Sequence, residues 1–89
     1  MFLQKTLKLI DPNGLHLRAA AQVVRITMKY HSRIIVSCGP MMADGRSILG
    51  LMTLSVAFGM LVTLTADGSD AREALSELQR LFESGFHKS

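Results

Sequence analysis

The chain has 89 residues, of which 48% are hydrophobic and 19% are charged, and its formal net charge is +3. This length supports one domain, residues 1–89, with a single core, and the apolar content excludes a disordered chain. The basic residues are scattered without a run or interleaved aromatic residues, which argues against nucleic-acid binding and favours acidic protein partners.

Cysteine usage and the start of the chain indicate the compartment. The single cysteine, Cys38, excludes an internal disulfide, and the first residues lack the basic and apolar segments of a secretory signal. We therefore expect a cytoplasmic protein. The histidines lack the spacing of metal ligands, so we expect no metal site, and no segment indicates a cofactor.

The first element is a strand that ends in a tight turn. Residues 2–10 alternate roughly between apolar and polar side chains, with Leu7 and Leu9 on one face. Residues 11–14, Asp-Pro-Asn-Gly, then predict a turn, because proline presets φ and Asn-Gly tolerates positive φ.

A helix and two short strands follow. Residues 16–29 predict a helix, and its inward-facing positions are expected to be Ala20, Val23, Val24 and Thr27. Residues 33–38 and 41–44 predict two strands around a Gly-Pro turn.

The segment from residue 47 to residue 66 has no charged side chain and is long and apolar enough for a membrane-spanning helix. Glycines interrupt it, however, and from residue 60 onward the apolar positions alternate. We therefore predict a short helix at 47–52 with Ser47 as N-cap, and a strand at 60–66, in place of a membrane span. The buried face of that strand is predicted to carry Met60, Val62, Leu64 and Ala66.

The last element is an amphipathic helix. Residues 70–73, Asp-Ala-Arg-Glu, form a variant of the capping box, and Gly85 ends the helix. Its buried positions are predicted to be Ala71, Ala74, Leu75, Leu78, Leu81 and Phe82. The element order predicts an α+β fold, an open-faced β-sandwich in which three helices cover one face of a four-stranded antiparallel sheet (βαββαβα).

One position carries the chemistry. His16 follows the Asn13-Gly14 pair where an alanine-rich helix begins, and Arg18 comes two residues later. The first turn of a helix has unpaired N–H groups and the positive end of the macrodipole, and so attracts anions. An imidazole there can accept a phosphoryl group whose oxygens the N–H groups of Leu17 and Arg18 and the Arg18 guanidinium hold. The pattern predicts a phosphohistidine at His16.

The segment Gly14-Leu15-His16-Leu17-Arg18-Ala19-Ala20 also resembles the motif of HPr, the histidine phosphocarrier family of the bacterial phosphoenolpyruvate-dependent sugar phosphotransferase system. The resemblance covers essentially the whole chain. Leu17 stands where the family has a small residue, and Ala19 where it has proline, a mild change in a first helical turn. Of these two departures, Leu17 places an apolar side chain beside the reactive ring.

The resemblance implies a set of partners. Enzyme I would phosphorylate His16 at Nδ1, and His16 would pass the group to sugar-specific IIA proteins. The chain would be a stoichiometric carrier and not an enzyme, a monomer that binds neither nucleic acid nor a membrane.

A second resemblance covers residues 46–54. In many HPr proteins a basic residue, a serine and an apolar helix of this form make a regulatory site. The resemblance implies that an HPr kinase/phosphorylase modifies Ser47 and that a carbon-catabolite transcription regulator reads this state. It also implies a docking surface made of Leu17, Arg46, Ile48, Leu49 and Met52.

Two alternatives stay open. The first is a regulatory paralogue that signals by its phosphorylation state without a main role in sugar transport, and Leu17 and Ala19 motivate it. The second is a small basic nucleic-acid-binding domain, which needs a basic strip on the sheet face that this sequence does not display.

Overall fold

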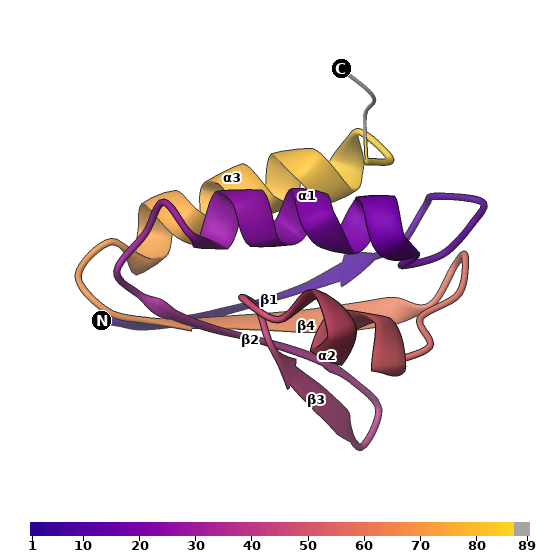
Figure 1. The fold of residues 1–89 in the computed structure, drawn as a ribbon. Helices are drawn as coiled ribbons and strands as arrows, with labels where there is room; N and C mark the ends of the chain where they lie inside the picture. Colours follow the sequence, from indigo (N-terminus) through magenta and orange to yellow (C-terminus); the bar gives the residue numbers. More distant parts are fainter. Residues whose placement is uncertain (87–89) are drawn as a thin grey trace.

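The chain forms an α+β sandwich with one sheet. The computed structural model describes residues 1–86. The sheet has four strands in the order β1-β4-β2-β3, and every neighbouring pair is antiparallel. In chain order the elements are β1 (Phe2–Lys8), α1 (Leu17–Thr27), β2 (Arg33–Cys38), β3 (Met41–Asp44), α2 (Ile48–Thr53), β4 (Leu61–Asp67) and α3 (Ala71–Glu83) (Figure 1). The predicted fold class and element order are confirmed.

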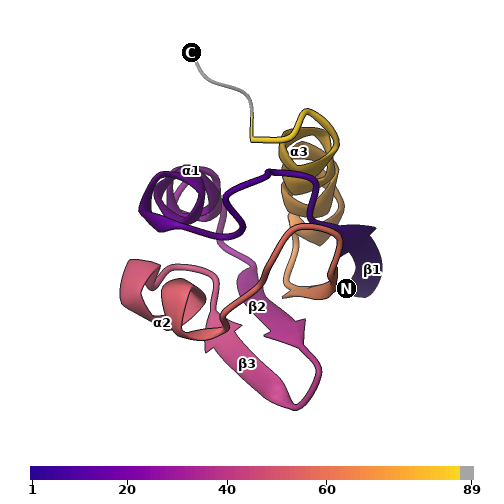
Figure 2. The same cartoon turned by 90° about the vertical axis from the view of Figure 1, so that its right-hand side faces the viewer.

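The helices cover one face of the sheet and leave the other face open (Figure 2). The central strand β4 pairs with both β1 and β2, and its residues Val62, Leu64 and Ala66 are fully buried beneath the helices. Met60, which was predicted to share that face, precedes the strand and is exposed. The prediction was right for the strand's interior and wrong at its first residue.

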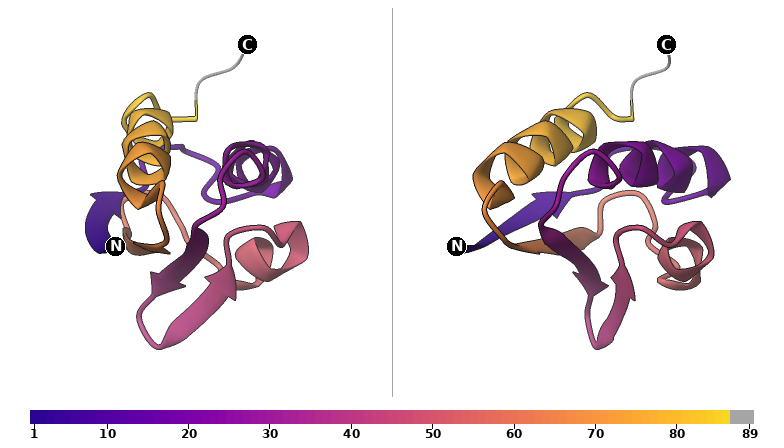
Figure 3. Two further views of the ribbon diagram at one scale, coloured as in Figure 1. Left: turned by 90° about the vertical axis from the view of Figure 1, so that its left-hand side faces the viewer. Right: turned by 60° about the vertical axis from the view of Figure 1, so that its left-hand side comes forward.

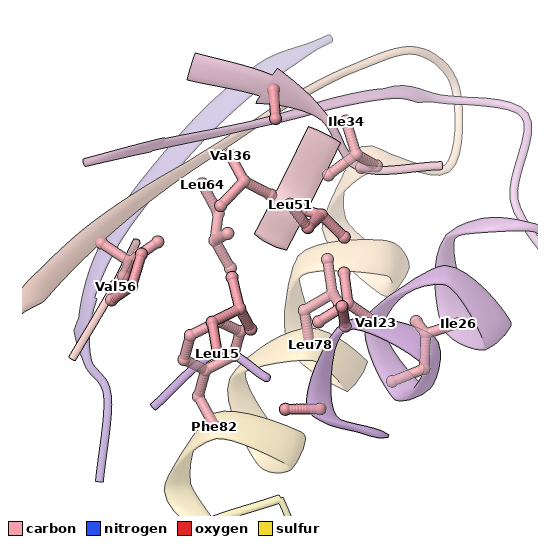
Figure 4. Packing of buried hydrophobic residues seen from close by; sticks show 14 of the residues in the cluster. Leu15, Val23, Ile26, Ile34, Val36, Leu51, Val56, Leu64, Leu78 and Phe82 are labelled. Atoms are coloured by element: carbon pink, nitrogen blue, oxygen red, sulfur yellow. The ribbon is translucent and has the colours of Figure 1, made fainter. Parts of the chain in front are cut away.

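The core is one cluster that joins all layers. Side chains from α1, α2 and α3 meet those of the sheet in a common interior (Figure 4). On α1 the buried set includes Ala19 and Ile26, which the sequence analysis did not place inward. Val24 and Leu81, both predicted to face inward, are only partly buried and pack against the margin of the core.

The uncharged segment forms the two predicted elements, α2 and β4, with a loop between them. Within residues 1–86, no helix combines the length and apolarity that crossing a membrane requires.

The end of α3 agrees with the prediction. Gly85 has a φ of +71° and its N–H donates to the carbonyl of Phe82 at 3.1 Å. The N–H of Phe86 donates to the carbonyl of Leu81 at 3.0 Å, which completes a Schellman motif. The Phe86 ring then packs edge-on against Phe82, with 4.8 Å between the ring centroids.

The start of α3 differs from the prediction. Asp70 is the N-cap residue, but its carboxylate makes no capping hydrogen bond to the helix. Instead it accepts hydrogen bonds from the backbone N–H groups of His31 (2.8 Å) and Ser32 (2.9 Å) and from the Ser32 hydroxyl. The capping-box interpretation was wrong because the carboxylate has partners 38 and 39 positions away in the sequence. Asp70 therefore connects the loop after α1 to the start of α3.

These hydrogen bonds, the Ser32 hydroxyl first, lower the pKa of Asp70 from 3.8 to about 2. Because the pKa in the folded chain lies below the unfolded value, the contribution of Asp70 is complete above pH 3.8 and is lost as the pH falls through about 2. We predict that Asp70→Asn lowers the free energy of unfolding at neutral pH. The variant should also lose less of this free energy than the wild type when the pH falls below about 4, which is near the ordinary pKa of an aspartate. Urea unfolding followed by circular dichroism at a series of pH values measures this.

Asp67, exposed at the end of β4, is the control site for this measurement. Asp67→Asn should keep the acid decline of the wild type. An equal flattening in both variants would show that the Asp70 contacts do not set the decline.

Candidate functional site

The turn before α1 is closed by two hydrogen bonds to Asp11. The N–H of Gly14 donates to the carbonyl of Asp11 at 3.0 Å, and the N–H of Asn13 donates to the Asp11 carboxylate at 2.8 Å. Gly14 has a φ of +73°, and a Cβ at this position would lie 2.5 Å from the carbonyl oxygen of Val56. Both the backbone angle and the close approach therefore require glycine. The next residue, Leu15, is buried, and its N–H donates to the same Val56 oxygen at 2.9 Å.

His16 is the N-cap residue of α1. Its backbone is extended, its carbonyl accepts from the N–H of Ala20 at 2.8 Å, and its Nδ1 accepts from the N–H of Arg18 at 3.2 Å. The side chain is 29% exposed. The ring therefore lies at the amide-rich start of the helix, where a partner protein can reach it.

A carboxylate that the sequence analysis assigned only to the turn lies behind this ring. Oδ2 of Asp11 is 3.3 Å from Nε2 of His16, and Asp11 is only 8% exposed. The signal that would have found it is a carboxylate five positions before the histidine, on the turn that folds back towards the helix start.

The two residues after His16 are exposed on the first turn of α1. Leu17 is 59% exposed, and Arg18 is also exposed. The first turn carries no acidic side chain. The start of α1 thus favours an anion, because the helix dipole is positive there and the first turn carries the basic Arg18 and no acidic side chain.

Ser47 is the N-cap of α2, as predicted, and its hydroxyl accepts from the N–H of Gly50 at 3.0 Å. The turn before it is attached to the end of α1, because the Thr27 hydroxyl donates to the carbonyl of Gly45 at 2.8 Å. Helix α2 runs antiparallel beside α1, and the chain that leaves it reaches Leu15 through Val56 (Figures 1 and 3). Ser47 is therefore at the end of α2 that lies farther from His16.

The predicted docking residues differ in exposure. Leu49 and Met52 are exposed on α2, whereas Ile48 is partly buried and packs against the core. The guanidinium of Arg46 donates to the carbonyl of Tyr30, so this side chain links the turn before α2 to the loop after α1. The exposed apolar surface of α2 thus consists of Leu49 and Met52 more than of Ile48.

The comparisons with known proteins agree on one family. The family model for the PTS HPr component phosphorylation site matches residues 3–84. The chain is 38% identical to the phosphocarrier protein HPr of Haemophilus influenzae over 77 residues. These residues make up 86% of this chain and 91% of the relative. The structure of this chain is similar to a crystal structure of HPr from Thermoanaerobacter tengcongensis, with a TM-score of 0.92, 36% identity and 98% of both chains covered. It is also similar to the crystal structure of the catabolite repression protein Crh of Bacillus subtilis, which is described as a domain-swapped dimer. Here the TM-score is 0.76 and the identity 30%, with 97% of this chain and 99% of Crh covered.

The close approach at Gly14 generates a stability prediction. Gly39 also has positive φ, at +60°, but a Cβ there would meet nothing within 4 Å. Gly39→Ala should therefore cost only the backbone penalty, about 1–2 kcal/mol. Gly14→Ala should cost about 1–3 kcal/mol more, because the added methyl group overlaps the Val56 carbonyl.

Urea unfolding of both variants measures the difference, and backbone amide NMR shifts show whether the start of α1 moves. Equal destabilisation of the two variants would show that the contact with Val56 does not constrain the turn.

Proposed function

Since the chain belongs to the HPr family of phosphocarrier proteins of the phosphotransferase system, we propose that His16 accepts a phosphoryl group from enzyme I and passes it to a histidine of a IIA protein. This relay takes place in the cytoplasm. The chain is consumed and regenerated in each cycle, so it is a substrate of enzymes and not itself an enzyme.

The observation that carries the proposal is the partly exposed His16 ring, whose Nδ1 lies at the start of α1. This nitrogen accepts from the N–H of Arg18, so its lone pair faces the amides of the first turn. In the transfer the lone pair attacks phosphorus, and the bond between phosphorus and the donor group of enzyme I breaks with its electron pair leaving to the donor. The phosphoryl oxygens then lie beside the amides, and the Arg18 N–H bonds to an oxygen instead of Nδ1.

Arg18 has a limited task in this scheme. Its exposed guanidinium neutralises part of the phosphoryl charge. A carrier has to release the group again, so binding that stabilised the loaded state more than the transition state would slow the relay. An exposed arginine, screened by solvent, meets this requirement better than a buried one.

We also propose that phosphorylation of Ser47 by an HPr kinase/phosphorylase regulates the relay. A phosphate at the N-terminus of α2 is compatible with the fold, because the free amides there favour negative charge. Since Ser47 is at the end of α2 away from His16, the phosphate acts on the docking of enzyme I over α2 and not on the reacting nitrogen. A carbon-catabolite transcription regulator is the proposed reader of the same state.

A second candidate function keeps the site and changes the role. The exposed Leu17 beside the ring, and the similarity to Crh over 97% of the chain, favour a regulatory paralogue. Transfer from phosphorylated His16 to IIA proteins separates the two candidates. Rapid onward transfer supports the carrier, and loading without transfer to any IIA protein supports the regulator.

His16→Ala should abolish acid-labile phosphorylation by enzyme I and phosphoenolpyruvate. The variant loses the capping hydrogen bond and the contact with Asp11, at a cost of about 1 kcal/mol each, so it should remain folded. Radiolabelling followed by acid treatment measures the adduct. His31→Ala, at an exposed histidine in the loop after α1, is the matched control and should label like the wild type. Persistent labelling of His16→Ala would move the acceptor to another residue.

Ser47→Asp should slow phosphorylation of His16 by about tenfold at low salt through a raised KM for enzyme I, because the added charge lies on the docking side. Steady-state transfer rates at several enzyme I concentrations measure it. Ser76→Asp places the same charge on the exposed face of α3 and should leave KM unchanged. Identical kinetics for both variants would contradict the regulatory role of Ser47.

A further inference from the structure

The carboxylate behind His16 has a geometry that the turn alone does not require. We propose that Asp11 is a positioning residue for phosphoryl transfer, which keeps the His16 ring in the tautomer that has its hydrogen on Nε2 and its lone pair on Nδ1. This inference rests on the proposed function of His16 and adds a residue to it.

Asp11 is anchored on both sides. Its Oδ1 accepts from the N–H of Asn13 at 2.8 Å, and its backbone carbonyl accepts from the N–H of Gly14 at 3.0 Å. The Asp11 side chain is 11% exposed, so the carboxylate has little freedom to turn into solvent. Its second oxygen, Oδ2, is left for the ring, 3.3 Å from Nε2 of His16. The turn therefore fixes an acceptor at one edge of the imidazole.

The two contacts of the ring specify one tautomer. A neutral imidazole has one N–H and one lone pair. Nδ1 faces the N–H of Arg18 at 3.2 Å, a donor, so this nitrogen has to be the acceptor. Nε2 faces the Asp11 carboxylate, which only accepts, so this nitrogen has to carry the hydrogen. Both neighbours of His16 thus favour the tautomer whose nucleophilic nitrogen is Nδ1.

The same carboxylate balances the charge of the loaded ring. When the Nδ1 lone pair forms the bond to phosphorus, the ring becomes cationic and keeps its hydrogen on Nε2. The adjacent Asp11 carboxylate offsets that positive charge, and no proton has to leave. On transfer to the next protein the P–Nδ1 bond breaks, and the electron pair returns to Nδ1. A carboxylate that orients a reactive imidazole has the same physical role in serine-protease triads.

A purely structural role makes a different prediction. The turn needs one acceptor oxygen on the side chain, which asparagine supplies as well as aspartate. In Asp11→Asn the amide oxygen can accept from Asn13, and the NH2 group then faces Nε2. A donor at that position favours a lone pair on Nε2 and the hydrogen on Nδ1. The substitution therefore preserves the turn and opposes the reactive tautomer.

The chain contains a matched control for this substitution. Asp44 starts a turn of the same kind, in which its Oδ1 accepts from the N–H two residues later at 2.9 Å and its carbonyl accepts from the N–H three residues later at 3.0 Å. Asp44→Asn thus makes the same chemical change in the same kind of turn, at a site distant from His16 in the chain.

The experiment measures tautomer and rate separately. Nitrogen-15 NMR of the unphosphorylated, neutral ring should show hydrogen on Nε2 of His16 in the wild type and in Asp44→Asn. In Asp11→Asn the new amide donor and the Arg18 N–H favour opposite tautomers, so the fraction of rings with hydrogen on Nε2 should fall. The maximal rate of His16 phosphorylation by enzyme I should fall about tenfold in Asp11→Asn, and KM should stay unchanged. This loss is smaller than that caused by the same substitution in a serine-protease triad, where the aspartate is fully buried. Thermal unfolding followed by circular dichroism should place the two variants close together.

An unchanged tautomer and rate in Asp11→Asn would overturn the inference, and so would an equal loss of rate in Asp44→Asn. Failure of the proposed function has a separate signature. In that case enzyme I phosphorylates neither the wild type nor the variants at His16. The tautomer of the ring in Asp11→Asn then still decides whether Asp11 positions it.

Discussion

The position of His16 depends on the close approach of Gly14 to the carbonyl oxygen of Val56. That oxygen accepts from the N–H of Leu15, and it leaves no space for a side chain on Gly14. The loop after α2 and the turn before α1 are therefore in direct backbone contact. Since α1 begins two residues later, this contact sets the orientation of the helix start and with it that of the His16 ring. The site is built by long-range backbone packing as much as by its own side chains.

The other end of α1 is fixed by charged and hydroxyl groups. Glu77 of α3 accepts from the Tyr30 hydroxyl at 2.6 Å and pairs with Lys29. The hydrogen bond from Lys29, and after it the one from Tyr30, lower the pKa of Glu77. The hydrogen bond between Tyr30 and Glu77 in turn raises the pKa of Tyr30. Asp70 anchors the following loop to α3. Helix α1 is thus held at both ends, by backbone contacts at its start and by side-chain contacts just beyond its last residue.

The sequence predicted those features that depend on neighbours in the chain. Alternation and turn residues located β2 and β3 at their observed bounds, and Ser47 and Gly85 act as the predicted helix ends. The errors concern partners distant in sequence. Asp70 looks like a helix cap locally, but the loop of His31 and Ser32 uses its carboxylate. The contact between Asp11 and His16 also needed the three-dimensional path of the turn, because a carboxylate there is equally typical of a simple turn.

The hydrogen bond between the Arg18 N–H and Nδ1 of His16 has a further consequence for the proposed carrier. Loading removes the ring nitrogen as acceptor and supplies a phosphoryl oxygen in its place, so the same amide is satisfied before and after. The helix then begins at the same residue in both forms, and neither form has to refold. In the proposed carrier, loss of this capping bond therefore adds nothing to the free-energy difference between the empty and loaded forms.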